Sequence, residues 1–305
     1  MCFFPGRFSH RHFRFVVFMA FVWTHSALAD DRPTKPGSAL QAVNQNHSEA
    51  TGNAQDSAAE SSAALLQEGK ECEKQGDQVK GQVLEADKSH RSTAELIGNE
   101  VQLYQCAIDD YSKAITKTPD NVEAYELRGM AFAKRDQDGH SSLLVASQVS
   151  NGGIPRVFGA IAEFGPEAIA DLNHAVEIAP KDAEAYYVRG EIYKMQFLNK
   201  YNLYFSLTDP AEKAQVNPDT SLARSAVADF KKATAINPHM GKAYEELGKL
   251  YVVCLRFSDA AASLRKAAEC GVSQNEKLLD RLDTVAKDPT KVGFTKAMLE
   301  SCSLE

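Results

Sequence analysis

One pattern of small and aromatic residues recurs along this sequence and constrains its fold more than any other feature. Three times, an aromatic residue stands four positions before a glycine. The pairs are Tyr125 and Gly129, Tyr186 and Gly190, and Tyr244 and Gly248. Residues three and four apart lie on one face of a helix, and a glycine on that face lets a second helix approach closely. The pattern therefore predicts an all-α chain of closely packed helices.

A second half-pattern, rich in alanine, precedes each of these pairs. Ala168, Leu172 and Ala175 show its helical spacing. Each copy closes on a proline: Pro119, Pro180 and Pro238. Proline cannot continue the hydrogen-bond ladder of a helix, so each proline marks a helix end. Together the two half-patterns predict antiparallel helix pairs, which bury their apolar faces by stacking on neighbouring pairs.

These half-patterns resemble the tetratricopeptide repeat, whose unit is a helix pair of about 34 residues. The resemblance covers residues 62–274, in copies at about 62–121, 122–182, 183–240 and 241–274. It implies a solenoid, a right-handed superhelix of antiparallel helix pairs whose first helices line a concave groove. In the family, that groove commonly binds peptides or extended protein segments. Residues 275–305 are expected to form helices that cap the end of the stack.

The closing prolines are 61 and 58 residues apart, so the first three copies are longer than the family unit and only the fourth keeps its length. In the first copy an apolar stripe continues in phase across Gly76, which predicts a long helical hairpin, although a mid-helix glycine can also mark a break. The third copy is expected to extend its first helix to about residue 207. In the second copy, Asp138 and Gly139 are expected to end the helix, and Pro166 to start the next one.

The insertion of the second copy, residues 142–164, is more apolar than a surface loop requires. These residues can pack over the neighbouring hairpins. They can also form an exposed flap that touches a partner or a membrane, because exposed apolar patches often mark interaction sites. The sequence leaves the role of this insertion open.

The resemblance also implies which side chains point into the groove, because fixed positions of the first helix have this role in the family. The corresponding residues here are Glu123, Glu126, Met130, Glu184, Tyr187, Glu191, Lys194, Glu245 and Lys249. Five of them are glutamates, which predicts a mildly acidic groove and a protein or peptide partner of basic character. A solvated helix face without a partner is the alternative.

The first 29 residues have the pattern of a secretory signal peptide: an arginine-rich start, an apolar run, and the small residues Ala27 and Ala29 at the cleavage site. The apolar run is shorter than the roughly 20 residues that span a membrane. The sequence therefore predicts export to the periplasm or the exterior with no stable membrane span, and an uncleaved anchor is the alternative. Residues 30–61 are small and polar, which predicts a disordered linker. Without the leader, 31 basic residues face 41 acidic ones, which argues against nucleic-acid binding.

The cysteines outside the leader, Cys72, Cys106, Cys254, Cys270 and Cys302, form no CxxC motif. They are expected to serve mainly as small apolar residues in helix contacts, and a disulfide between Cys72 and Cys106 is left open. No spacing of histidines, carboxylates or nucleophiles predicts a catalytic site, a metal site or a cofactor. The predicted function is a non-enzymatic scaffold that binds proteins or peptides. The alternative is a structural subunit of a cell-envelope assembly that docks through its insertions, and the oligomeric state is left open.

Overall fold

The computed structural model describes residues 62–89, 92–149, 165–206, 213 and 220–292. The elements in these ranges are α3 (Ser62–Lys88), α4 (Ala94–Lys117), α5 (Val122–Val149), α7 (Pro166–Ile178), α8 (Ala183–Ser206), α10 (Thr220–Ile236), α11 (Gly241–Val253), α12 (Phe257–Glu269), α13 (Glu276–Lys287) and the short helix η1 (Pro289–Val292). The predicted all-α fold of helix pairs is confirmed. Within these ranges, no helix is both long and apolar enough to cross a membrane. The predicted leader, the linker, residues 150–164 of the insertion and residues 293–305 lie outside them.

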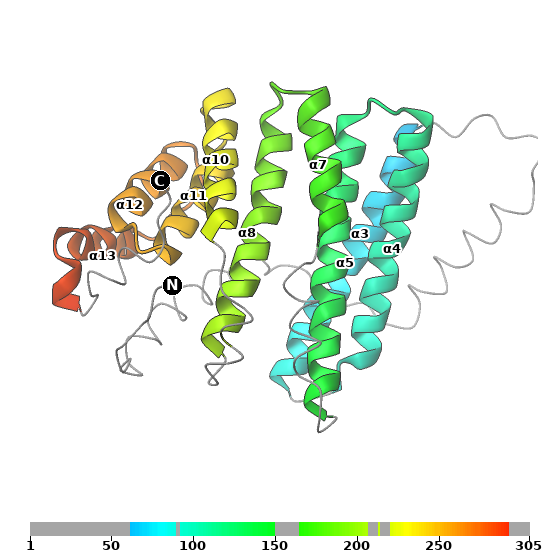
Figure 1. Cartoon of the computed structure of the whole chain (residues 1–305), viewed down its shortest axis with the longest axis horizontal. Coiled ribbons are helices and arrows are strands. Elements are labelled where there is room, and N and C mark those ends of the chain that lie inside the picture. Colours follow the sequence, from blue (N-terminus) through cyan, green and yellow to red (C-terminus); the bar gives the residue numbers. More distant parts are fainter. Residues whose placement is uncertain (1–61, 90–91, 150–164, 207–212, 214–219, 293–305) are drawn as a thin grey trace, which may run out of the picture. The chain divides into compact units, whose positions relative to one another are not determined.

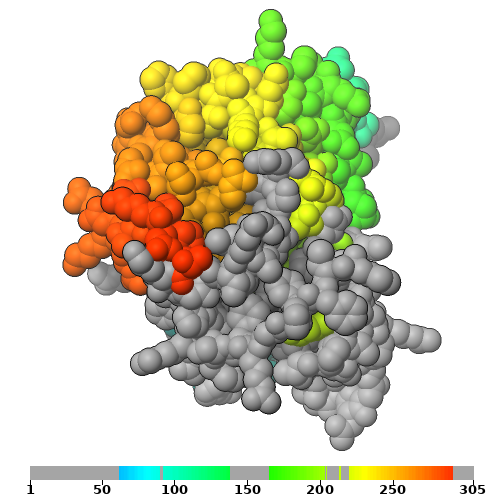
Figure 2. Space-filling view, turned by 60° about the vertical axis from the view of Figure 1, so that its left-hand side comes forward, coloured from blue at the N-terminus to red at the C-terminus, as the bar shows by residue number. Residues whose placement is uncertain are grey.

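The helices form two compact units, each described by itself. The N-terminal unit contains α3, α4, α5, α7 and α8 as far as Ile192, and the C-terminal unit contains α8 from Tyr193 onward and α10 to η1. In the N-terminal unit, α3 packs on α4, α4 on α5 and α5 on α7 (Figure 1). In the C-terminal unit, α10, α11, α12 and α13 pack in chain order, and they form one continuous surface from yellow to red in Figure 2.

The long hairpin predicted for the first copy is confirmed by α3 and α4. Helix α3 continues without a break through Gly76. This glycine and Gly69 make room for two aromatic rings of α4. A Cβ atom at Gly76 would lie 2.8 Å from the ring of Tyr104, and one at Gly69 would lie 2.4 Å from the ring of Tyr111. Both tyrosines are fully buried. The two glycines therefore allow the rings to fill the core between the helices.

We expect Gly69→Ala to lower the free energy of unfolding by about 2 kcal/mol. The added methyl group has to displace the ring of Tyr111, and this overpacking outweighs the gain of about 1 kcal/mol that alanine brings to a helix. Gly81 lies on the same helix, but a Cβ there would meet no atom within 4 Å. Gly81→Ala is therefore expected to stabilise the protein by about 0.5–1 kcal/mol. Urea unfolding measures both variants, and a change of the same sign in the two would contradict the role of Gly69.

In the second and fourth copies, small residues let the two helices of a pair approach closely, as the pattern predicts. A Cβ atom at Gly129 would lie 3.1 Å from Leu172 and 3.2 Å from the carbonyl oxygen of Ala168. A Cβ atom at Gly248 would lie 2.6 Å from Leu264. The start of α7 is also as predicted, with Pro166 as its first residue.

One expectation for the second copy is wrong. Helix α5 does not end at Asp138 and Gly139 but continues to Val149. Glycine costs a helix about 1 kcal/mol relative to alanine, and aspartate costs less. A penalty of this size does not end a helix that is already nucleated and packed against its neighbours. All three long copies therefore have an extended first helix: α3, α5 and α8.

The repeat prolines follow the ends of the second helices. Helices α4, α7 and α10 end at Lys117, Ile178 and Ile236, and Pro119, Pro180 and Pro238 stand two residues later. Polar side chains then cap the next first helices. The Oδ1 atom of Asn121 accepts a hydrogen bond from the amide of Ala124 at 3.1 Å, and that of Asp182 accepts one from Glu184 at 2.8 Å. The turns from α4 to α5 and from α7 to α8 therefore each contain a proline after the first helix and a polar residue that caps the next one.

Candidate functional site

The first helices of the first two copies contact each other through charged side chains. The ammonium group of Lys134 on α5 donates to Glu73 and to both carboxylate oxygens of Asp77 on α3, each at 2.9 Å. Lys70 of α3 pairs with Glu123 of α5 at 2.6 Å. We call these five residues the first-helix face. It places Glu123, one of the predicted groove residues, directly beside α3.

Two buried tyrosines of α4 hold the carboxylates of this face. Tyr111 donates its hydroxyl to Glu73 at 2.9 Å, and Tyr104 donates to Asp77 at 2.8 Å. Burial raises the pKa of Tyr111, and the charge of Glu73 raises it further. Burial alone lowers the pKa of Lys134, but the charges of Glu73 and Asp77 outweigh this effect and raise it. Lys134 is therefore a charged bridge between α5 and α3 at neutral pH.

The predicted groove residues of the N-terminal unit differ in their accessibility. Glu123 is exposed and Met130 is half-buried, whereas Glu126 is only 8% exposed. Three more of these residues are half-buried on the first turns of α8: Glu184, Tyr187 and Glu191. Of the predicted groove carboxylates in this unit, Glu123 is therefore the most accessible, Glu184 and Glu191 are partly accessible, and Glu126 belongs to the packed interior.

The three predicted groove residues of the C-terminal unit lie in one ion-pair cluster. Lys194 of α8 pairs with Glu246 of α11, and Lys249 contacts Glu246 at 2.6 Å and Glu245 at 3.1 Å. Glu246 was not among the predicted residues. Its spacing of three positions from Lys249 is visible in the sequence, but its contact with Lys194 joins two copies and requires the fold. Burial raises the pKa of Glu246, and the charges of Lys194 and Lys249 outweigh burial, so that the net shift is downward.

The lowered pKa of Glu246 is expected to make the stability of the C-terminal unit depend on acid pH. A carboxyl group of this kind stabilises the fold above its unfolded pKa of about 4.3, and the contribution is lost as the pH falls through the folded-state pKa. We expect Glu246→Gln to remove this dependence, so that stability falls less steeply on the acid side than in the wild type. Glu269→Gln is the matched control, because Glu269 forms an exposed pair with Lys266. Urea unfolding over a pH series measures the slopes, and equal slopes for the two variants would contradict the role of Glu246.

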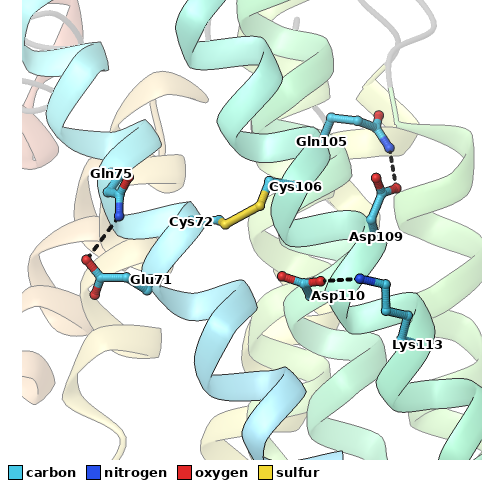
Figure 3. The surroundings of a disulfide bond; sticks show 8 residues. All are labelled: Glu71, Cys72, Gln75, Gln105, Cys106, Asp109, Asp110 and Lys113. Carbon is cyan, nitrogen blue, oxygen red and sulfur yellow. Dashed lines mark hydrogen bonds and ion pairs between the residues drawn. A yellow bond between two sulfur atoms is a disulfide. The ribbon is translucent and has the colours of Figure 1, made fainter. Parts of the chain in front are cut away.

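The first hairpin carries a disulfide between Cys72 of α3 and Cys106 of α4 (Figure 3). Their Cα atoms are 6.0 Å apart, a separation that a disulfide spans without backbone movement. The two sulfurs and a carboxylate oxygen of Asp110 all lie within 4.8 Å of one another. Cys254 is also disulfide-bonded, and Cys270 is a free thiol. The sequence left a disulfide between Cys72 and Cys106 open, and the structure contains it. The expectation that the cysteines serve mainly as small apolar residues is wrong for Cys254, which is also disulfide-bonded.

The repeated helix pairs and their small-residue contacts define this chain as an all-α helical repeat protein with a tetratricopeptide-like fold. No protein-family model and no curated protein sequence matches the chain. Among solved structures, it is similar to the crystal structure of MamA, with 20% identity over 56% of this chain and 90% of that chain, and a TM-score of 0.26.

Two further solved structures are similar to this chain. One is a tetratricopeptide repeat protein from Parabacteroides merdae, at 15% identity, covering 91% of this chain and 100% of that chain, with a TM-score of 0.27. The other is a monomeric mutant of IFIT1 with Gppp-AAAA, at 16% identity, covering 93% of this chain and 66% of that chain, with a TM-score of 0.29. At these identities and TM-scores, none of the three assigns a function to this chain.

Proposed function

We propose that this chain is an exported scaffold that binds a basic peptide, or an extended basic segment of another protein, along the first helices of its N-terminal unit. One observation carries the proposal. Four of the predicted groove residues on α5 and on α8 as far as Ile192 are glutamates, and three of these four are exposed or half-buried. The lysine of this face, Lys134, is paired with Glu73 and Asp77. The half-buried Met130 and Tyr187 supply apolar contact area among these carboxylates.

The accessible carboxylates can accept a partner's cation at little cost. The Lys70 and Glu123 side chains are 41% and 55% exposed, and an exposed ion pair of this kind contributes about 0–1 kcal/mol. A lysine or arginine of the partner can therefore take the place of Lys70 beside Glu123. Lys134 does not compete for the same carboxylate, because Glu73 and Asp77 hold its ammonium group.

Two independent features support export. The leader has the charge, length and cleavage pattern of a signal peptide. The hairpin of α3 and α4 is closed by the disulfide between Cys72 and Cys106, and structural disulfides persist mainly in oxidising compartments outside the cytosol. Alkylation of thiols in the protein as isolated from its source, before any reduction, tests this. Modification of Cys72 and Cys106 at that stage would contradict export to an oxidising compartment.

Binding is proposed instead of catalysis because three buried or half-buried charged groups form ion pairs with neighbouring helices. Lys134 joins α5 to α3. Arg128 of α5 makes two hydrogen bonds of 2.7 Å to Asp171 of α7. Glu246 is held by two lysines. Groups that perform acid–base chemistry need access to a substrate, and these three face neighbouring helices.

The test uses a triple variant, Glu123→Gln, Glu184→Gln and Glu191→Gln, and a polybasic peptide of mixed lysine, arginine and leucine as the probe. If each carboxylate contributes about 0.5 kcal/mol, we expect the Kd to rise about tenfold. The binding should also weaken with added salt in the wild type and less so in the variant, because the interaction is between accessible charges. Fluorescence anisotropy of a labelled peptide measures both effects.

A second triple variant carries the same change of net charge on the second helices of the same unit. It combines Asp109→Asn, Glu167→Gln and Glu177→Gln, whose side chains are all exposed on α4 and α7. This control is expected to keep the wild-type Kd within about twofold, because its charges lie away from the proposed site. If both triple variants weaken binding equally, only the net charge matters and the proposed site is wrong.

A further inference from the structure

We propose that the reduced form of this chain binds one divalent metal ion of zinc-like chemistry through Cys72, Cys106 and Asp110. Two thiolates and a carboxylate are ligands that Zn²⁺ accepts, and a site with three protein ligands leaves a fourth position for water or another small ligand. The three groups come from α3 and α4, whose packing fixes them relative to one another. In the oxidised chain, Cys72 and Cys106 instead form the disulfide.

The geometry of the three groups suits such an ion. Their ligand atoms all lie within 4.8 Å of one another. In a tetrahedral zinc site with Zn–S bonds of about 2.3 Å, neighbouring sulfurs are about 3.8 Å apart. Once the disulfide is reduced, rotation of the cysteine side chains can bring the two sulfurs to this separation. The helix backbones can therefore stay in place, with the Cα atoms of Cys72 and Cys106 near their present 6.0 Å.

The surroundings of the Asp110 carboxylate also point to a ligand. Its side chain is fully buried. One oxygen, Oδ1, accepts a hydrogen bond from Lys113 at 2.8 Å. The other, Oδ2, has no hydrogen-bond partner among the described residues, and a buried polar atom without a partner is unfavourable. Figure 3 shows this second oxygen turned toward α3, below the disulfide. A cation between the helices would give Oδ2 the partner that it lacks.

The neighbouring carboxylate, Asp109, has none of these properties. It is exposed, and its Oδ1 atom accepts a hydrogen bond from Gln105 at 2.8 Å on the outer side of the same helix (Figure 3). The two aspartates are adjacent, so they share the charge and the helix but not the site. This makes Asp109 a matched control for Asp110.

The metal-bound and disulfide forms exclude each other. A dithiol reductant gives two electrons and two protons to the disulfide, which becomes two thiols while the reductant becomes a disulfide. The metal ion then binds both sulfurs as thiolates and releases their two protons to solvent. Oxidation of the two thiolates by a disulfide donor reverses this and expels the ion. The redox state of the first hairpin would therefore determine whether it holds a metal ion.

Co²⁺ is the probe for the first test, because thiolate ligands give it an intense charge-transfer absorption. The full chain is reduced with a trialkylphosphine, which takes oxygen from water and leaves as the phosphine oxide, and is titrated without air. We expect one Co²⁺ per reduced chain, displaced by Zn²⁺, and no such absorption in the oxidised chain. Asp110→Asn should weaken Co²⁺ binding at least about tenfold, whereas Asp109→Asn should not change it.

Two cysteine variants show which sulfur atoms give rise to the Co²⁺ absorption. Cys72→Ser should abolish it, and Cys254→Ser should retain it. Absorption that survives Cys72→Ser, or equal affinities of the Asp110→Asn and Asp109→Asn variants, would overturn the proposal.

A second test needs no variant. Zn²⁺ should raise the unfolding temperature of the reduced wild-type chain progressively with its concentration, because it binds the folded form. The oxidised chain should show no shift. Equal behaviour of the two forms would show that the proposal is wrong, even if a variant fails to fold.

Discussion

Replacing Lys134 by methionine is expected to lower the free energy of unfolding by about 3 kcal/mol. The ammonium group of Lys134 is the shared partner of Glu73 and Asp77. Its removal leaves two carboxylates near each other, with one of them largely buried. Methionine fills most of the volume of the lysine stem, so the loss reflects the missing charge and not a cavity.

Lys88→Met is the matched control for this prediction. Lys88 also forms an ion pair, with Glu85 three residues earlier on α3, but the two side chains are 60% and 68% exposed. The expected change is within about 0.5 kcal/mol. Urea unfolding followed by circular dichroism at neutral pH measures both variants. If Lys134→Met loses no more free energy of unfolding than Lys88→Met, the bridge does not hold α5 to α3.

The pH dependence of the same pair follows from the raised pKa of Lys134. A lysine whose folded-state pKa is raised stabilises the fold fully below its unfolded pKa of about 10.4, and the contribution disappears as the pH rises through the folded-state pKa. The stability difference between wild type and Lys134→Met should therefore stay constant from neutral pH to about pH 9 and shrink in stronger alkali.

The second large effect is expected from removing the disulfide. Cys72 and Cys106 are 34 residues apart in sequence, and a cross-link over a loop of this length restricts the unfolded chain by about 3–4 kcal/mol. We expect the double variant Cys72→Ala and Cys106→Ala to lose about this much stability relative to the oxidised wild type. Reduction of the wild type without metal should have a similar effect.

Cys270→Ala separates the cross-link from the loss of a thiol. Cys270 is a free, partly buried cysteine, and its replacement should change stability by less than about 1 kcal/mol. Thermal and urea unfolding without reductant measure the two variants. Equal stabilities of the double variant and Cys270→Ala would mean that the disulfide does not stabilise the fold.

The fold could be predicted because the residues on each helix face recur at local, helical spacings in the sequence. Ala168, Leu172 and Gly129 follow helical periods that depend on neighbours only three or four positions away, and the structure packs them as expected. The length of α5 was not predictable in the same way, since the penalty at Asp138 and Gly139 is small compared with the stability of a long helix.

The candidate site was less predictable because it depends on contacts between distant residues. The bridge from Lys134 to Glu73 and the disulfide from Cys72 to Cys106 require the register of one helix against another. The family positions indicate which residues line the first helices, but not how deeply each is buried. Glu126 holds such a position and is nevertheless in the interior.

Tyr111, which lies over Gly69 in the N-terminal unit, and Tyr201 in the C-terminal unit each give an optical signal. The only tryptophan of the chain, Trp23, is in the predicted leader, so tyrosine dominates the near-ultraviolet absorbance of the rest. An exposed tyrosine ionises near pH 10, but burial raises the pKa of Tyr111 above this value. In the C-terminal unit, burial raises the pKa of Tyr201 to about 12. A late step of tyrosinate absorbance in an alkaline titration would therefore report when the helices around these side chains open to water.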